Sequence, residues 1–472
     1  MTVFFNPLNG LIPFRPDYPN SLLIILCQGR RQRIFRRMPA LAITGSESGS
    51  PPENATLECR PGAPGRMGPA IDMSIAVNFH AGQENMASAC VPSVARVVRL
   101  EVLDDLAAAE PFWRALEPDA WATPYQRFDL LAAWHHHVGA RNGIVPFIVV
   151  GFDAGSRPVF LWPFGRKQVG SLRLASFLGS KHASFNIGLW RRDLAAAIGE
   201  GDLRDLLARS AAGRAPVDLF TLYDQPLRWA GLANPFALLP HQLSAEDGSC
   251  LTLDSPAGRI EAAVSPAMRS RLRIKERKLK KLPGYGYVQA KSAADIDRML
   301  DAFFALKAVH MRAQGLTNVF AQPGVAEFVR QSSHAKLADG RPLIELHALE
   351  GDGEVLAVFG AVVDPYRFSA MFNTYTLSGH ARHSPGLILL QHMIGACAER
   401  GARSFDIGVG RAHYKSFFCK EPEPLFDTFL PFTPRGRLAA PAFRAAFAAK
   451  RIIKSKPALW AAVQFTRRVR AG

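Results

Sequence analysis

A run of three strands, one helix and a fourth strand in the second half of the chain constrains its fold more than any other feature. Residues 342–375 are rich in apolar and β-branched side chains and are divided by two polar turns, GDGE and DPYR, which predicts three strands. The segment GLILLQHMIGACAERGA then has helical spacing, and SFDIGV reads as a strand. Because a helical crossover joins parallel strands, we predict a mixed sheet with a strand-to-helix junction beside its last strand.

The remaining chain has the same mixed character. VPFIVVGFD and RPVFLWPFGRK are β-rich runs separated by a turn, and helical patterns surround them. A chain of 472 residues is too long for one ordinary domain. We therefore predict an α+β protein with an N-terminal domain at 94–253, a C-terminal domain at 254–434 and a basic helical tail at 435–472. Residues 1–93 include a stretch rich in Gly, Pro, Ser and Asn and are expected to be a disordered or non-native extension.

Positive charge is concentrated in two places. The chain has 57 Lys and Arg against 40 Asp and Glu, a net charge of +17, which favours anionic partners. The run RSRLRIKERKLKK has charges on almost every face of the helix it would form, so we do not expect a helix with only one solvent-exposed side. The run is either solvated, or it binds an anionic acceptor or a phosphate. The tail after Asp427 contains no acidic residue, and it either rests on an anionic membrane surface or packs on the preceding domain.

Other features exclude several classes of site. The six cysteines show no CxxC or other metal-ligand spacing, which predicts neither a zinc site nor a disulfide framework and fits a reducing cytoplasm. SLLIILC is too short to span a bilayer, and we predict no signal peptide and no transmembrane helix. The three histidines of WHHHV, His135–His137, would point to different faces of a helix and cannot share one ion, so we predict no metal site.

The strand-to-helix junction is SGHARHSPGLILL. Ser384 can cap the helix, Pro385 suits its first turn, and Gly386 lets another group approach the backbone closely. Free amide groups at a helix start, with Arg382 beside them, form a site for a pyrophosphate. The alternative is a helix that is merely well capped.

The stretch FDIGVGRAHYK contains the candidate catalytic residues. The strand with Asp406 should run beside the strand before the helix, and ligands collect where such parallel strands diverge at their carboxyl ends. Gly408 and Gly410 lie at that edge. Tyr414 would donate a proton to a departing thiolate, and Lys415 would stabilise negative charge on a reacting carbonyl or an anionic acceptor. Alternatively, Tyr414 packs in the core and Lys415 is solvated.

These segments resemble the GNAT-type acyltransferases of the CelD-like branch, which is grouped with cellulose biosynthesis and related to the FemAB peptidyltransferases. The resemblance is carried by SRLRIKERKLKKL, FFALKAVHMRAQG, SPGLILLQHMIGACAERG and FDIGVGRAHYKSFF, with weaker matches in TPYQRFDLLAAWHHHVG and FLGSKHASFNIGLW. It implies two tandem GNAT-like folds, with an acyl donor in the splayed sheet of the second.

Carried over onto this chain, the resemblance also implies site residues. Asp406 would shape the end of the last strand, and Tyr414 would be the general acid, with Lys415 beside it. The family's pyrophosphate loop has the pattern Gln or Arg, two residues, Gly, one residue, Gly or Ala, whereas this chain has RHSPGL with one glycine. The residues expected to bind coenzyme A there are Arg382, His383, Ser384, Gly386 and Leu387.

The activity implied is transfer of an acyl group, expected to be acetyl from acetyl-CoA, to an amine or hydroxyl of a sugar-related or cell-envelope acceptor in exopolysaccharide or cellulose biosynthesis. No general base is assignable, because Asp406, Glu345 and His413 are all conceivable. Two alternatives stay open: a FemAB-like aminoacyl transferase that uses charged tRNA, and a catalytically silent scaffold of a polysaccharide-secretion complex. No RNA-reading module is found, so no nucleic acid other than tRNA is expected.

Overall fold

The computed structural model describes residues 97–253, 264–410, 412–419, 422–456, 458, 459 and 463. These residues form two large mixed sheets with helices packed on them, which confirms the predicted α+β class. The predicted extension at 1–93 lies outside the described residues. None of the described helices is long and apolar enough to cross a membrane.

The first sheet is built mainly from the first half of the chain. Its strands lie in the order β1-β2-β3-β4-β6-β17-β9, and β5 pairs with β3. Aromatic rings fill its core; Trp162, for example, stacks on Phe160 with ring centroids 4.4 Å apart and also contacts Trp190. The strands are β1 (Arg99–Leu103), β2 (Val145–Phe152), β3 (Pro158–Val169), β4 (Leu172–Phe177), β5 (Leu189–Trp190), β6 (Leu219–Pro226), β9 (His241–Leu243) and β17 (Leu425–Pro431). The helices are α2 (Leu106–Leu116), α3 (Phe128–Trp134), α4 (Arg192–Ala197) and α5 (Glu200–Ala211).

The second sheet contains the predicted strand pattern. Its order is β11-β12-β13-β14-β15-β10-β16. β12, β13 and β14 pair antiparallel in sequence, a helix follows, and β15 returns parallel to β14, which confirms the predicted crossover. The strands are β10 (Gly248–Thr252), β11 (Gly286–Gln289), β12 (Glu345–Gly351), β13 (Glu354–Val363), β14 (Arg367–Tyr375), β15 (Ser404–Val409) and β16 (Pro422–Glu423). The helices are α7 (Pro266–Leu279), α8 (Ala293–Ala313), α9 (Val325–His334) and α10 (Pro385–Glu399).

Helices α8 and α10 cover opposite faces of the second sheet. Both pack on β13 and β14, but their buried side chains belong to two separate apolar clusters. α8 begins at a capping box, in which Ser292 Oγ accepts from the Asp295 N–H and the Asp295 carboxylate accepts from the Ser292 N–H, both at 3.1 Å. The edge of β14 that faces β15 therefore lies between two helical layers.

The two sheets exchange strands across the predicted boundary at residue 253. β10, which ends the predicted N-terminal domain, pairs with β15 of the second sheet, whereas β17 from the predicted C-terminal domain pairs with β6 and β9 of the first. A side chain also joins the halves, since Arg127 Nη2 donates to the carbonyl of Val363 at 2.6 Å. The halves are interlocked because each sheet takes a strand from the other half. The domain boundary at residue 253 stays a prediction.

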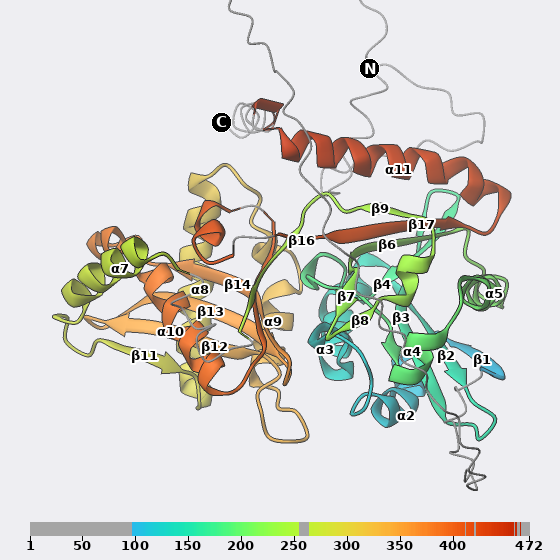
Figure 1. Cartoon of the computed structure of the whole chain (residues 1–472), viewed down its shortest axis with the longest axis horizontal. Helices are drawn as coiled ribbons and strands as arrows, with labels where there is room; N and C mark the ends of the chain where they lie inside the picture. The colour runs from blue at the N-terminus through green and yellow to red at the C-terminus, as the bar shows by residue number, and fades with distance from the viewer. Residues whose placement is uncertain are drawn as a thin grey trace, which may run out of the picture. The chain divides into compact units, whose positions relative to one another are not determined.

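A long C-terminal helix, α11 (Pro434–Ser455), packs on the first sheet beside β17 (Figure 1). Phe447 stacks on Tyr223 with ring centroids 4.7 Å apart, and Arg444 donates to the carbonyl of Phe429 at 2.9 Å. For this part of the basic tail, the structure shows packing on the protein. Contact of its outer face with an anionic membrane stays a prediction.

Candidate active site at the strand fork

β14 and β15 separate after a short parallel pairing. Their paired residues are Arg367 with Ser404, Phe368 with Phe405 and Ser369 with Asp406. Beyond these pairs β14 runs on to Tyr375 and β15 to Val409. We call this divergence, formed by residues 370–375 and 407–409, the strand fork. Along it the edge of β14 that faces away from β13 no longer pairs with β15. An unpaired edge of this kind is where ligands bind in open sheets.

A β-bulge in β14 changes which side chains face α10. Ala361 of β13 pairs with Ala370, but Gly360 pairs with Phe372, so that one residue of β14 is extra. Ala370 lies in the apolar cluster of α10, whereas Phe372 lies in the cluster that includes α8 residues. The bulge thus turns Asn373 toward the α10 side of the fork, which strict alternation along the strand would not do.

Asp406 is fully buried at the point where pairing ends. Its Oδ1 accepts from the N–H of Gly408 at 2.7 Å, and within the described part of the chain Oδ2 makes no hydrogen bond of normal geometry. Burial raises the pKa of this carboxyl to about 7, against the lowering effect of the Arg367 guanidinium. Gly408 has a φ of +82°, and a Cβ there would lie 3.2 Å from the carbonyl oxygen of Ala370. Asp406 and Gly408 together set the path of the chain as it leaves β15.

Lys415 is buried beneath the fork. It lies in a short 3₁₀ helix, His413–Phe417, and its side chain donates from Nζ to the carbonyls of Gly408 at 2.9 Å and Val409 at 3.0 Å. Burial lowers the pKa of its ammonium group. Only 8% of the residue is exposed, so the alternative that Lys415 is solvated is wrong. The ammonium group fixes the end of β15, and a direct role at a reacting carbonyl stays a prediction.

Tyr414 reaches from the same short helix to β14. Its hydroxyl accepts from Asn373 Nδ2 at 3.1 Å, which leaves the phenolic proton available for donation. The ring packs against the apolar cluster of α10 and is half-buried, and burial raises the pKa of the hydroxyl. Packing and proton donation are therefore compatible here, because the ring is in the core while the hydroxyl lies at the fork.

The junction before α10 differs from a simple capped helix. Ser384 has a left-handed backbone, with φ +56° and ψ +51°, and its side chain makes no capping bond, so the predicted cap is wrong. Its Oγ instead accepts from Lys275 Nζ at 2.7 Å. Pro385 begins α10 as predicted. A Cβ at Gly386 would meet only Tyr375, at 3.7 Å, which is ordinary contact, so neighbouring side chains do not require glycine there.

The structure brings the basic helix to this junction. α7 packs by a narrow apolar face, Met268, Leu272 and Leu279, so the prediction that it has no single wet side is wrong. Most of the remaining residues of α7 are charged, and the helix packs beside the 3₁₀ turn Gly379–His383. Burial lowers the pKa of His383, and positive charge lowers it further. The neighbours responsible are Arg382, His380, Lys275 and Lys278. Leu387 is half-buried in the first turn of α10, and Arg382 is exposed.

Two residues of α8 that the sequence analysis did not select also lie at the fork. Lys307 Nζ donates to the carbonyl of Asn373 at 3.0 Å, and His310 Nδ1 is 3.0 Å from Thr374 Oγ1. His310 Nε2 is buried and has no hydrogen-bond partner among the described residues, and the ring lies 4.6 Å from that of Tyr375. Burial lowers the pKa of both side chains. Their spacing of three places both on one helix face, a signal that was present in FFALKAVHMRAQG.

The other conceivable bases have different surroundings. Glu345 is buried, yet its hydrogen bond with His347 and the nearby Arg400 guanidinium lower its pKa against the effect of burial. Arg400 donates to it at 3.0 Å, and His347 Nε2 lies at 3.2 Å. Glu345 is thus an ion-paired carboxylate of β12. His413 is exposed and packs edge-on against Phe417.

The histidines of WHHHV bind separate partners. His135 Nε2 lies 2.9 Å from the carbonyl of Ile144, and His137 Nε2 lies 2.5 Å from Gln331 Oε1 on α9. In the part of the chain that the structure describes, no three His, Cys, Asp or Glu side chains are grouped so as to hold a metal ion.

Residues 266–416 match the family model of the acetyltransferase (GNAT) domain. That segment is GNAT-like. It runs from α7 to the short helix with Tyr414 and includes the whole fork. The comparison with curated proteins gives no match.

Several solved structures resemble the chain weakly. FemX is 11% identical, with a TM-score of 0.47 over 72% of this chain and 99% of that one. L-PGS from Bacillus licheniformis is 12% identical, with a TM-score of 0.42 over 73% and 97%. A conserved protein of unknown function from Bacteroides thetaiotaomicron is 11% identical, with a TM-score of 0.44 over 70% and 100%. Similarity at this level assigns neither a fold nor an activity.

Proposed function

We propose that the second half of the chain is an acyltransferase that moves an acyl group, expected to be acetyl from acetyl-CoA, to an amine or hydroxyl. The observation that supports this most is the position of the Tyr414 hydroxyl. It is held by Asn373 where β14 and β15 diverge, inside the segment that matches the GNAT domain. The site thus combines open strand backbone with a protonated acid.

The donor would lie along the fork with its pyrophosphate at the start of α10. The N–H groups of a first helical turn and the positive end of its dipole favour phosphate. Lys275 and Lys278 add positive charge from α7, beside Arg382 and His383. Since no neighbouring side chain requires glycine at 386, we propose that close approach of the donor does.

Each group at the fork then has a distinct role. Backbone N–H groups of β14 beyond the pairing would bind the thioester carbonyl oxygen, and Tyr414 would protonate the leaving thiolate, because its raised pKa keeps it protonated near neutrality. His310 is our candidate for the general base, since burial lowers its pKa, which favours the neutral imidazole, and Nε2 has no partner among the described residues. Asp406 and Lys415 would act as positioning residues that fix the end of β15.

Titration calorimetry with acetyl-CoA tests the donor claim directly. We expect Gly386→Ala to abolish or strongly weaken binding without loss of stability, because its Cβ fits the protein. Gly201→Ala on α5, where nothing lies within 4 Å, is the matched control and should bind like the unmodified chain. Absence of heat at high micromolar acetyl-CoA, or normal binding by Gly386→Ala, contradicts the proposal.

Replacement of the acid tests the chemistry. Tyr414→Phe should lower kcat by about a hundredfold or more while donor affinity changes little. Tyr223→Phe in the first sheet is the control, because its ring packs on α11 away from the GNAT-like segment. Unchanged turnover in Tyr414→Phe would remove its catalytic role. The silent scaffold of a polysaccharide-secretion complex predicts instead that the unmodified chain has no turnover.

A second candidate is aminoacyl transfer from charged tRNA. The observation that favours it is the convergence of α7 cations on a junction that has one glycine where acetyl-CoA loops have two small residues. It predicts tRNA binding that weakens steeply as salt rises. Filter binding of charged tRNA decides between the donors. The sugar-related or cell-envelope acceptor, including a role in cellulose or exopolysaccharide biosynthesis, stays a prediction that an acceptor screen would test.

A further inference from the structure

A cavity that is open to solvent lies at the other end of the strands that form the fork. Its volume is about 440 Å³, within the range of small-molecule sites. Tyr366 and Arg403 directly precede β14 and β15, so the cavity is at the amino ends of these parallel strands, whereas the fork is at their carboxyl ends. The lining residues are Arg192, Ala230, Gly231, Pro365, Tyr366 and Arg403. The cavity is therefore separate from the proposed donor site.

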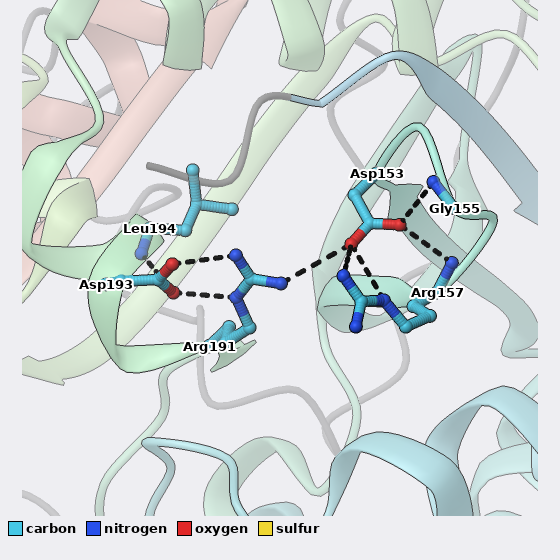
Figure 2. Close-up of polar contacts among 6 residues, drawn as sticks. All are labelled: Asp153, Gly155, Arg157, Arg191, Asp193 and Leu194. Atoms are coloured by element: carbon cyan, nitrogen blue, oxygen red, sulfur yellow. Dashed lines mark hydrogen bonds and ion pairs between the residues drawn. The ribbon is translucent and has the colours of Figure 1, made fainter. Parts of the chain in front are cut away.

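Arg192 differs from its neighbour Arg191 in having no carboxylate. Figure 2 shows Arg191 between two aspartates: it donates to both oxygens of Asp193 at 2.7 Å and lies 3.4 Å from Asp153. Asp153 also forms an ion pair with Arg157, at 2.9 Å. The acids of this region are thus already paired. Within the described residues, Arg192 makes neither an ion pair nor a side-chain hydrogen bond, and it lines the cavity instead.

Arg403 on the other wall is equally unpaired. Its backbone N–H donates to the carbonyl of Tyr366 at 3.1 Å, which fixes its position, but no described residue pairs with its guanidinium. Among the described residues, the cavity therefore has two arginines without a paired carboxylate, one from each half of the chain. Two positive charges that line one cavity favour an anion there.

The remaining walls are held in place. Ala230 and Gly231, with φ of +43° and +87°, form the tight turn between β7 (Arg228–Trp229) and β8 (Leu232–Ala233), and Arg228 donates to the carbonyl of Gly231 at 2.6 Å. Below the turn, the Arg367 guanidinium lies 4.1 Å from the ring centroid of Trp229. These walls of the cavity are therefore in place before a ligand binds.

We propose that this cavity binds the phosphate group of a phosphorylated small molecule between Arg192 and Arg403. A phosphate group carries more negative charge than a carboxylate and presents its oxygens in tetrahedral directions, so it can accept from two guanidinium groups on different walls at once. Tyr366 offers a flat surface for a sugar or base attached to the phosphate. The inference does not depend on the proposed acyl transfer.

Titration calorimetry of the full chain with inorganic phosphate and with glucose 6-phosphate tests this. We expect binding that weakens by about tenfold or more in Arg192→Gln and in Arg403→Gln. Arg214→Gln, at an exposed arginine away from the cavity, should bind normally. So should Lys275→Gln, which lowers the charge at the start of α10. Glucose should not bind. Both cavity arginines are exposed, so the variants should melt like the unmodified chain.

Three outcomes would overturn the proposal. The first is no binding of either phosphate compound at millimolar concentration. The second is phosphate binding that Lys275→Gln abolishes and the two cavity variants leave intact, which would place the anion at the junction. The third is citrate binding the cavity more tightly than glucose 6-phosphate, which would make it a carboxylate site.

Discussion

The two basic helices, α7 and α11, look alike in sequence but use their charge in opposite ways. Cations of α11 are bound within the protein: Arg451 pairs with Asp247, Lys454 pairs with Glu246, and Arg444 donates to a backbone carbonyl. α7 contributes Lys275 to the junction of a proposed donor site, where the neighbouring side chains are themselves cationic. A basic run in the sequence therefore indicates a binding site for an external anion only where acidic residues of the same protein do not already pair with its cations.

The largest expected effect is the loss of stability when a side chain that attaches α7 or α11 to its sheet is truncated. Leu272→Ala should cost about 3 kcal/mol of unfolding free energy and also weaken donor binding, because this buried leucine holds α7 on the second sheet. Phe447→Ala should cost about 2 kcal/mol, because its ring is only partly buried, and should leave donor binding intact. Urea unfolding and calorimetry measure both quantities. If Phe447→Ala weakened donor binding as much as Leu272→Ala, the two helices would not be functionally distinct.

The comparison also shows what the sequence can predict. The three strands, the helix and the parallel fourth strand follow from local periodicity and from the handedness of crossovers, so they were predictable. The inner face of α7 was missed because its few apolar residues are spread among many cations. The exchange of β10 and β17 between the sheets depends on pairing partners far apart in sequence, which no local pattern encodes.

The site was predictable to a similar degree. FDIGVGRAHYK indicated where the last strand of the candidate site ends, because glycines with positive φ, Gly408 and Gly410, lie there. The burial of Lys415 was not readable, since a lysine that is bound by two carbonyls looks the same in sequence as a solvated one. His310 became a candidate only when the fold placed it beside Thr374. Long-range contacts, not residue type, supplied this information.

A smaller effect concerns single charges. Lys275→Gln should weaken acetyl-CoA binding by about tenfold, roughly 1.4 kcal/mol, because it removes a charge and a hydrogen bond at the junction. The same substitution in α11, Lys450→Gln, should not change donor affinity. Calorimetry at low salt measures both, and the difference should shrink as salt screens the charge. Equal weakening by the two variants would show that only the net charge of the protein matters.

The smallest effect tests the role proposed for α11 as a source of internal counter-ions. Burial raises the pKa of Asp427 and of its neighbour Asp224, and the charge of Lys450 opposes both shifts. A carboxyl whose pKa is raised in the folded state stabilises the fold below its unfolded pKa, and that stabilisation is lost as pH rises through the folded pKa. Lys450→Gln raises both values further, so the free energy of unfolding should fall more steeply from about pH 5 to about pH 8, by about 0.5 kcal/mol beyond the unmodified chain.

Urea unfolding at both pH values measures this difference, with Lys278→Gln on α7 as the matched control. Lys278 adds positive charge near His383 and, among the described residues, forms no ion pair with a buried acid. Its variant should therefore give a pH dependence parallel to that of the unmodified chain. If the Lys450→Gln curve were also parallel, the α11 cations would be no more tied to buried acids than those of α7, and the contrast between the two helices would be limited to their packing.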